Sequence, residues 1–365
     1  MFDRRLIYNF DWVLLLTVLL LTAVGILNLY SVTASWGYGA TPFYLKQLIW
    51  LSGGLSIALL VCLFDYRQLQ YFAVHAYLVG VGLLVAVEVL GRTSMGATRW
   101  IHLGFINVQP SEVIKIVMIL LFARLLSKRV TAQGFGLGDL WRPALWLLVP
   151  VVLILKQPDL GTTIMVALIA LTMLLFAGLK RGTLVWLSLF AGVGMVLGWF
   201  GLHDYQRARI RTFLHPEADP LGSGYHIIQS KIAIGSGGLF GKGFVQGTQS
   251  QLSFLPERHT DFAFSVFAEE WGFTGSLLLL LVYFFLIAWG LYIARRAGDR
   301  FGLFLAVGVT AMIFWHIIVN LAMVVGLLPV VGVPLPFFSY GGTSMVTMMI
   351  GVGLLLNVSM RRFMF

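Results

Sequence analysis

Ionisable side chains crowd into one short segment, LPERHTDFAF at residues 255–264, directly before a strongly apolar stretch. Asp261 is the sharpest candidate for chemistry in this segment, because at helical spacing it shares a face with Glu257 and Glu269 and has phenylalanines around it. Desolvation raises the pKa of a carboxylate in such surroundings, which suits a general base. A structural alternative is that Thr260 or Asp261 caps the following helix.

The neighbours of Asp261 extend the candidate site. His259 beside Asp261 raises the question of metal binding, but two residues do not make a metal site, so any metal ligands stay unassigned. We expect Glu257, Arg258 and His259 to contact the substrate of whatever reaction Asp261 serves.

A glycine-rich segment, GSGGLFGKGF at residues 235–244, is similar in composition to a phosphate-binding loop. It fits neither nucleotide template, because Ser236 stands where the first Walker glycine belongs and Gly243 follows Lys242 where Ser or Thr should hold magnesium. We therefore predict a tight turn in which the backbone approaches another segment closely. Lys231 and Lys242 are then candidates for contact with an anionic lipid head group.

Two further segments, QPSEVIK at 109–115 and KQPDLGT at 156–162, place proline at a predicted helix start. Ser111 and Asp159 are plausible caps. Helix N-termini bind anions, so we predict two parallel half-sites that present these helix starts to the head groups of a lipid-linked phosphate.

Charged residues near these helix starts support the same interpretation. Lys115, Lys156 and Arg99 add positive charge. The alternative is that Glu112 and Lys115 only neutralise each other three residues apart inside a helical bundle. The sequence leaves both interpretations open.

The elements that position these residues must lie in a membrane. The chain of 365 residues is 59% hydrophobic and 11% charged, with a mean hydropathy of +0.90, which excludes a soluble globular class. Its net charge of +10 is scattered between apolar runs, so no nucleic-acid surface is predicted. The single cysteine, Cys62, excludes an internal disulfide.

A helix needs about 20 apolar residues to cross the hydrocarbon core, and this length predicts ten transmembrane helices. The protein is thus expected to be an all-α integral membrane protein that forms one polytopic membrane domain over residues 1–365. The predicted spans are 11–31, 44–64, 71–90, 112–127, 143–156, 160–178, 184–200, 264–294, 301–327 and 343–360.

Lys and Arg residues in the short loops predict the orientation, because cytoplasmic loops carry an excess of them. They favour cytoplasmic N- and C-termini. The long loop at 201–263, between the seventh and eighth spans, then faces outward as a structured, catalytic extracytoplasmic loop that ends in the Asp261 segment.

Six ordered segments together resemble the SEDS family of bacterial membrane proteins, which serve shape, elongation, division and sporulation. Arg258 is more similar to the elongation members than to the division members, which usually have alanine there. The resemblance covers nearly the whole chain and is carried by TRWI at 98–101, the two proline segments above, 224–244, LPERHTDFAFSVFAEEWGF at 255–273 and PLPFFSYGGTS at 334–344.

This resemblance implies a peptidoglycan glycosyltransferase that polymerises lipid II into glycan strands for cell elongation and rod shape. It implies that the essential aspartate is Asp261. It also implies a class B penicillin-binding protein as transpeptidase partner, other membrane proteins of the elongation complex, and stimulation by a divalent cation, Mg²⁺ or Mn²⁺, with no organic cofactor. The expected location is the bacterial inner membrane, with the active loop on the periplasmic or exterior side.

The expected chemistry needs only one carboxylate. Lipid II carries an α-linked pyrophosphate and the new bond is β, so a single inverting displacement is expected. Pyrophosphate leaves without a general acid, in contrast to the alcohol released by glycoside hydrolases. Asp261 then deprotonates the acceptor 4-hydroxyl, and cations neutralise the departing charge. The candidate cations are Arg99, Lys115, Lys156, Arg211, Lys231 and Lys242, with Glu112 and Asp159 as further substrate-binding candidates.

The main alternative is a transporter that moves lipid II between the leaflets. Glu88, Lys115 and Lys156 would then line a hydrophilic path. A third interpretation is a scaffold that only recruits the transpeptidase. The enzyme is favoured because ionisable groups concentrate on the predicted outer side of the spans.

Overall fold

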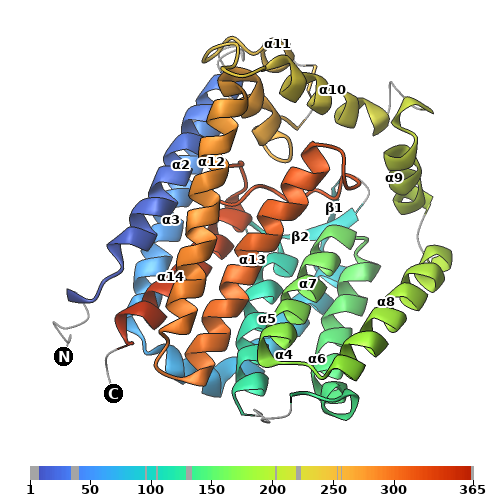
Figure 1. Cartoon of the computed structure of the whole chain (residues 1–365). Coiled ribbons are helices and arrows are strands. Elements are labelled where there is room, and N and C mark those ends of the chain that lie inside the picture. Colours follow the sequence, from blue (N-terminus) through green and yellow to red (C-terminus); the bar gives the residue numbers. More distant parts are fainter. Residues whose placement is uncertain are drawn as a thin grey trace.

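The protein is a helical bundle in the computed structural model (Figure 1). The structure describes residues 8–33, 41–94, 97–103, 106–128, 134–201, 204–218, 223–252, 254–255 and 257–362. The long helices are α2 (Trp12–Thr33), α3 (Phe43–Leu63), α4 (Tyr66–Leu90), α5 (Pro110–Ser127), α6 (Leu137–Lys156), α7 (Leu160–Ala177), α8 (Arg181–Gly201), α12 (Ala263–Arg295), α13 (Arg300–Val324) and α14 (Gly342–Met360).

These helices lie where the ten spans were predicted. Within the described ranges, eight of them are long and apolar enough to cross a membrane, and α5 and α8 are not among the eight. Helix α5 carries Glu112, Lys115 and Arg124 within its 18 residues, which lowers its apolar character. The chain is therefore a multi-pass helical protein, and ten membrane crossings remain a prediction.

Helices α13 and α14 form the centre of the bundle. In an 18-residue apolar stretch of each helix, 78% of the residues of α13 and 83% of those of α14 are buried, whereas the share for α3 and for α6 is only 22%. Helix α13 packs against α5, α7 and α12, and α14 packs against α3. The outer helices leave their apolar side chains exposed, as expected for helices in contact with lipid tails.

The segment between α8 and α12 is built from short elements. These are α9 (Asp204–Leu214), the 3-10 helix η1 (Pro216–Ala218), α10 (Ser223–Ser236) and α11 (Thr248–Gln251). Figure 1 shows α10 and α11 at the end of the bundle opposite the start of α2 and the end of α14. The segment at 201–263 thus contains short helices, and its extracytoplasmic placement stays a prediction.

The chain is mostly helical, but the expected all-α fold has one exception, a small sheet between α4 and α5. Strands β1 (Arg92–Ser94), β2 (Ala97–Leu103) and β3 (Ile106–Val108) form an antiparallel sheet in the order β1-β2-β3. Ile101 pairs with Val108 across β2 and β3. Such β-branched pairs favour strands, but they are too few to predict a sheet within an apolar chain.

The glycine-rich segment makes the close backbone approach that its sequence predicted. Gly272 has a positive φ of 66° and kinks α12. An added Cβ at Gly272 would lie 2.3 Å from the backbone nitrogen of Gly241, and one at Gly237 would lie 2.1 Å from the carbonyl oxygen of Ala268. Only glycine allows these two backbones to meet, so the turn fixes the top of α12.

Candidate functional site

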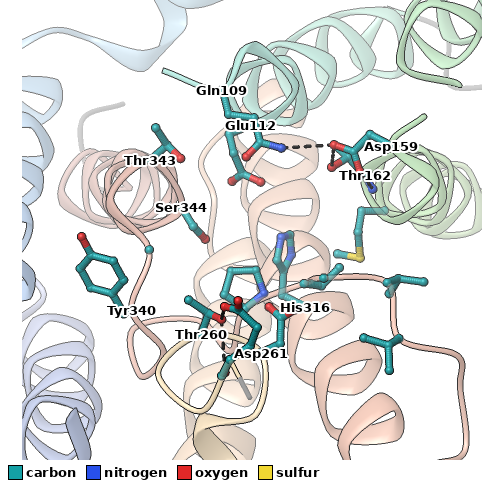
Figure 2. Close-up of a pocket in the computed structure, with 18 of the residues that line it drawn as sticks. Gln109, Glu112, Asp159, Thr162, Thr260, Asp261, His316, Tyr340, Thr343 and Ser344 are labelled. Carbon is teal, nitrogen blue, oxygen red and sulfur yellow. Dashed lines mark hydrogen bonds between the residues drawn. The ribbon is translucent and has the colours of Figure 1, made fainter. Parts of the chain in front are cut away.

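A cavity of about 1070 Å³, with several charged side chains in its lining, opens beside the segment that precedes α12. Side chains from α5, α7, α9, α10 and α13 line it, together with the sheet and residues 330–344 (Figure 2). Pro334 and residues 340–344, from the segment PLPFFSYGGTS, form part of the wall. Besides Asp261, four predicted site residues line this cavity: Glu112, Lys115, Asp159 and Glu257.

Asp261 lies in the turn at 257–262 and is half-buried in the cavity wall. An added Cβ at Gly332 would lie 3.6 Å from Asp261 Oδ2, so a bare backbone leaves room beside the carboxylate. Among the described residues, no donor bonds to that carboxylate. The capping alternative does not hold, because the cap residue of α12 is Phe262 and no side chain caps this helix start.

The surroundings of Asp261 make it a base suited to neutral pH. Burial raises the pKa of Asp261 to about 6, the nearby Glu257 carboxylate adds to the rise, and Arg209 opposes it. A carboxylate with that pKa is largely ionised at neutral pH and still accepts a proton more readily than an ordinary aspartate. The expected rise in pKa by desolvation is therefore confirmed.

Glu112 and Lys115 form a buried ion pair in the opposite wall. Lys115 Nζ lies 2.7 Å from Glu112 Oε1, and both side chains are almost completely buried. Lys115 Nζ also lies 2.8 Å from His316 Nε2 on α13. The neutralising pair that was one alternative is thus present, and it lies within the candidate site.

The starts of α5 and α7 meet at Asp159, although only α5 begins with proline. The Asp159 carboxylate accepts hydrogen bonds from the backbone nitrogen of Thr162 at 3.2 Å and from Gln109 Nε2 at 3.2 Å. The predicted cap at Asp159 is confirmed, whereas Ser111 does not cap α5. Asp159 bonds one backbone amide at the start of α7, that of Thr162, and the two anion-binding half-sites stay a prediction.

Six predicted binding residues lie away from the cavity lining within the described chain. Lys156, Arg211 and Lys231 are exposed. The side chain of Arg99 lies outside the described residues. The six residues are Lys156, Arg211, Lys231, Lys242, Arg258 and His259.

Three of these six have structural surroundings instead. Lys242 Nζ pairs with Glu269 Oε1 at 2.7 Å and so ties the glycine-rich turn to α12. Arg258 is 4% exposed, and its burial lowers the pKa of the guanidinium. The ring of His259 stacks on Phe43 with centroids 4.2 Å apart, and burial lowers the pKa of this imidazole.

Sequence reasoning missed several residues of the cavity. Arg209 lines it and donates to the carbonyl oxygen of Val330 at 3.0 Å, but in the sequence it is one of several basic residues of the loop. His226 and His316 also line it. An ionisable residue such as His316 inside an apolar span is a functional signal that could have identified it.

The fold and this cavity define a multi-pass membrane protein with a carboxylate of raised pKa, Asp261, at one end of its helical bundle. The family model of the cell cycle proteins FtsW, RodA and SpoVE matches residues 11–363. The chain therefore belongs to this family, the SEDS family whose motifs it resembles.

Curated relatives and solved structures agree with this assignment. The chain is 44% identical over 341 residues to peptidoglycan glycosyltransferase MrdB of Escherichia coli K12, covering 93% of the chain and 92% of the relative. It is 34% identical to peptidoglycan glycosyltransferase RodA of Treponema pallidum, covering 98% and 99%.

Two solved structures share the fold over almost the whole chain. RodA of Thermus thermophilus superposes with a TM-score of 0.72 at 32% identity, covering 97% of this chain and 98% of that one. A structure described as the structural coordination of polymerization and crosslinking by a peptidoglycan synthase complex contains a chain with a TM-score of 0.82 at 35% identity, covering 98% and 99%.

Proposed function

We propose that the chain polymerises lipid II into glycan strands at the outer face of the bacterial cytoplasmic membrane, with Asp261 as general base. The chain is a peptidoglycan glycosyltransferase of the elongation type, as its 44% identity over 93% of its length to such an enzyme indicates. The observation that carries the site is Asp261, a carboxylate with a pKa of about 6 in the wall of a cavity of about 1070 Å³.

The geometry supports an inverting displacement. The acceptor 4-hydroxyl attacks the anomeric carbon of the donor, and Asp261 takes its proton as the new glycosidic bond forms. The bond to the pyrophosphate breaks at the same time, and the lipid pyrophosphate leaves as an anion. No second carboxylate acid is required, because this leaving group needs no proton.

The charges of the cavity support a divalent cation as cofactor. Four carboxylates line it against two permanent cations, so a pyrophosphate would meet excess negative charge. Mg²⁺ is typically held by one or two carboxylates together with substrate phosphates. The described side chains contain no group of three or more metal-ligating residues, so substrate phosphates would have to complete the coordination of such an ion. The carboxylates are Glu112, Asp159, Glu257 and Asp261, and the cations are Lys115 and Arg209.

Glu257 is the carboxylate best suited to share such a cation, either Mg²⁺ or Mn²⁺. Its side chain is exposed at the cavity rim, and among the described residues only Thr260 Oγ1 donates to it, at 3.0 Å. Glu112 and Asp159 are instead engaged by Lys115 and by the start of α7. The bound ion would neutralise charge on the leaving pyrophosphate.

A class B penicillin-binding protein and other membrane proteins of the elongation complex are the proposed partners. The support is a relative of known structure that belongs to a peptidoglycan synthase complex coordinating polymerization and crosslinking. The outward orientation of the cavity is supported by the Lys and Arg distribution in the short loops.

The transporter alternative has less support. Glu88 and Lys156 are exposed and do not line the cavity, so they mark no path through the bundle. The middle of α5 is instead an apolar, buried run, as Met118, Ile119 and Leu121 show.

A gel assay of labelled lipid II in detergent tests the proposed function. We expect glycan ladders from the purified wild-type protein with its transpeptidase partner and divalent cation, and none from Asp261→Asn. Ladders from both proteins would reject Asp261 as the base. Absence of ladders from both, with lipid II flipping in liposomes, would favour the transporter.

A further inference from the structure

Three buried side chains of α5 and α13 form a hydrogen-bonded chain in the cavity wall. Lys115 Nζ lies 2.7 Å from Glu112 Oε1 and 2.8 Å from His316 Nε2. Glu112, Lys115 and His316 are 6%, 1% and 1% exposed, and all three line the cavity. Figure 2 shows Glu112 and His316 around the same space as Asp261.

The contacts of His316 define its tautomer. Its Nδ1 lies 2.7 Å from the carbonyl oxygen of Met312, which only accepts hydrogen bonds, so Nδ1 carries a proton. Its Nε2 faces the ammonium of Lys115, which only donates, so Nε2 is the acceptor. The imidazole is therefore neutral, and it holds the Lys115 ammonium in one direction.

The three side chains together carry no net charge. The positive charge of Lys115 is offset by the Glu112 carboxylate at hydrogen-bond distance, and His316 adds none. A phosphate near Lys115 would also be near that carboxylate, so attraction and repulsion largely cancel. This arrangement does not favour the phosphate contact that the sequence predicted for Lys115.

Unused hydrogen-bonding capacity indicates a different ligand group. The Lys115 ammonium has three donors, and its two described partners use two of them. Glu112 Oε2 is buried, and no described residue donates to it. A buried charged oxygen is costly to leave without a donor. The unused donor of Lys115 and the unused acceptor of Glu112 are adjacent. They match a ligand group that both accepts and donates hydrogen bonds, whereas a phosphate oxygen only accepts them.

We propose that Glu112 and Lys115 form a subsite for a hydroxyl or acetamido group on a sugar of the lipid-linked substrate. His316 is the positioning residue of this subsite, because it orients the Lys115 ammonium and touches no reacting atom. The inference rests on the proposed function, since it assigns one part of that substrate. The pyrophosphate is then bound elsewhere, near Arg209 and the divalent cation.

Binding of two lipids to the full-length protein in detergent separates the sugar from the phosphate. The probes are labelled lipid II and undecaprenyl pyrophosphate, which has no sugar. We expect His316→Leu to weaken lipid II binding about three- to tenfold, as for one lost hydrogen bond, and to leave undecaprenyl pyrophosphate binding unchanged. His316→Gln restores lipid II binding, because its side-chain oxygen can accept from Lys115. His75→Leu, on the exposed side of α4, is the matched control and binds like the wild type.

Equal weakening of both lipids in His316→Leu would overturn the proposal in favour of a phosphate site, and unchanged binding of both would leave His316 a packing residue. If His316→Leu does not fold, Glu112→Gln takes its place, since its amide puts a donor where Oε2 accepts. Weaker lipid II binding alone supports the proposal, and tighter binding of undecaprenyl pyrophosphate contradicts it. A wild type that binds neither lipid would reject the proposed function itself, which is a distinct result.

Discussion

Asn320 on α13 holds the backbone of Asp261 in place. Its Nδ2 donates to the carbonyl oxygen of Asp261 at 2.9 Å and to that of Val333 at 2.8 Å. One buried amide thus joins the turn at 257–262 to the loop on the other side of the cavity. The position of the proposed base therefore depends on a residue of α13 that lies 59 positions further along the chain.

Replacement of this amide should affect both stability and rate. Asn320→Leu leaves two carbonyl oxygens without their donor, which costs about 1–3 kcal/mol of unfolding free energy for each group that stays buried. A base misplaced by about 1 Å can lower the rate about 10²-fold. Thermal unfolding and the lipid II gel assay measure the two effects.

Asn357→Leu is the matched control for Asn320→Leu. Asn357 donates to the carbonyl oxygens of Val61 and Phe64, at the end of α3 far along the chain from the site. We expect it to lower thermal stability but to leave the turnover of folded protein near the wild-type value. Equal turnover in both variants would refute a positioning role for Asn320.

Loss of the Asp261 carboxylate should abolish catalysis but leave substrate binding intact. General-base catalysis contributes about 10²- to 10⁴-fold in rate, so Asp261→Asn should lose that factor in polymerisation. Lipid II binding and partner binding should persist, because the amide keeps the shape of the side chain. Near-normal strand synthesis by the purified variant would exclude Asp261 as the base.

The pH dependence of polymerisation should follow the ionisation of Asp261. The rate should fall as the pH drops through about 6, because protonated Asp261 cannot accept a proton. Glu257 raises this pKa and Arg209 lowers it. In assays without divalent cation, where Glu257 acts only through its own charge, Glu257→Gln should therefore move the acid limb to lower pH, and Arg209→Gln should move it to higher pH. Shifts of equal sign in the two variants, measured as normalised initial rates, would contradict this assignment.

The same raised pKa predicts a cost in stability. The folded protein binds the Asp261 proton more tightly than the unfolded chain does, so stability falls as the pH rises from 3.8 to about 6 and the cost persists above that range. Asp261→Asn should therefore raise the melting temperature at neutral pH. The gain should shrink as the pH is lowered below about 6, which differential scanning fluorimetry can follow.

The glycine-rich turn offers a paired test of close backbone packing. An added Cβ at Gly237 would lie 2.1 Å from the carbonyl oxygen of Ala268, whereas one at Gly235 meets nothing within 4 Å. Gly237→Ala should lower stability by about 1–3 kcal/mol, as overpacking does. Gly235→Ala should be neutral or slightly stabilising, since Gly235 lies in α10 and alanine is the better helix former. Similar melting temperatures for the two variants would count against the docked turn.

Local features of the sequence determined the membrane helices and the proposed base. Apolar runs of sufficient length predict helices wherever they occur, because an unpaired backbone is too costly in lipid. Asp261 stood out because a charged residue beside an apolar membrane helix is energetically costly, and such residues are therefore functional candidates. The cap at Asp159 and the tight turn at 235–244 were also predicted, since both depend on residues close together in the chain.

Only the tertiary structure decided which side chains meet in the cavity. His316 and Lys115 are 201 residues apart and in contact, and no spacing rule relates them. Lys242 looked like a ligand for a lipid head group, yet packing places it on Glu269. A charge in a sequence has no direction, because its partner is set by which helices pack together. The burial of α13 at the bundle centre therefore decided the composition of the site.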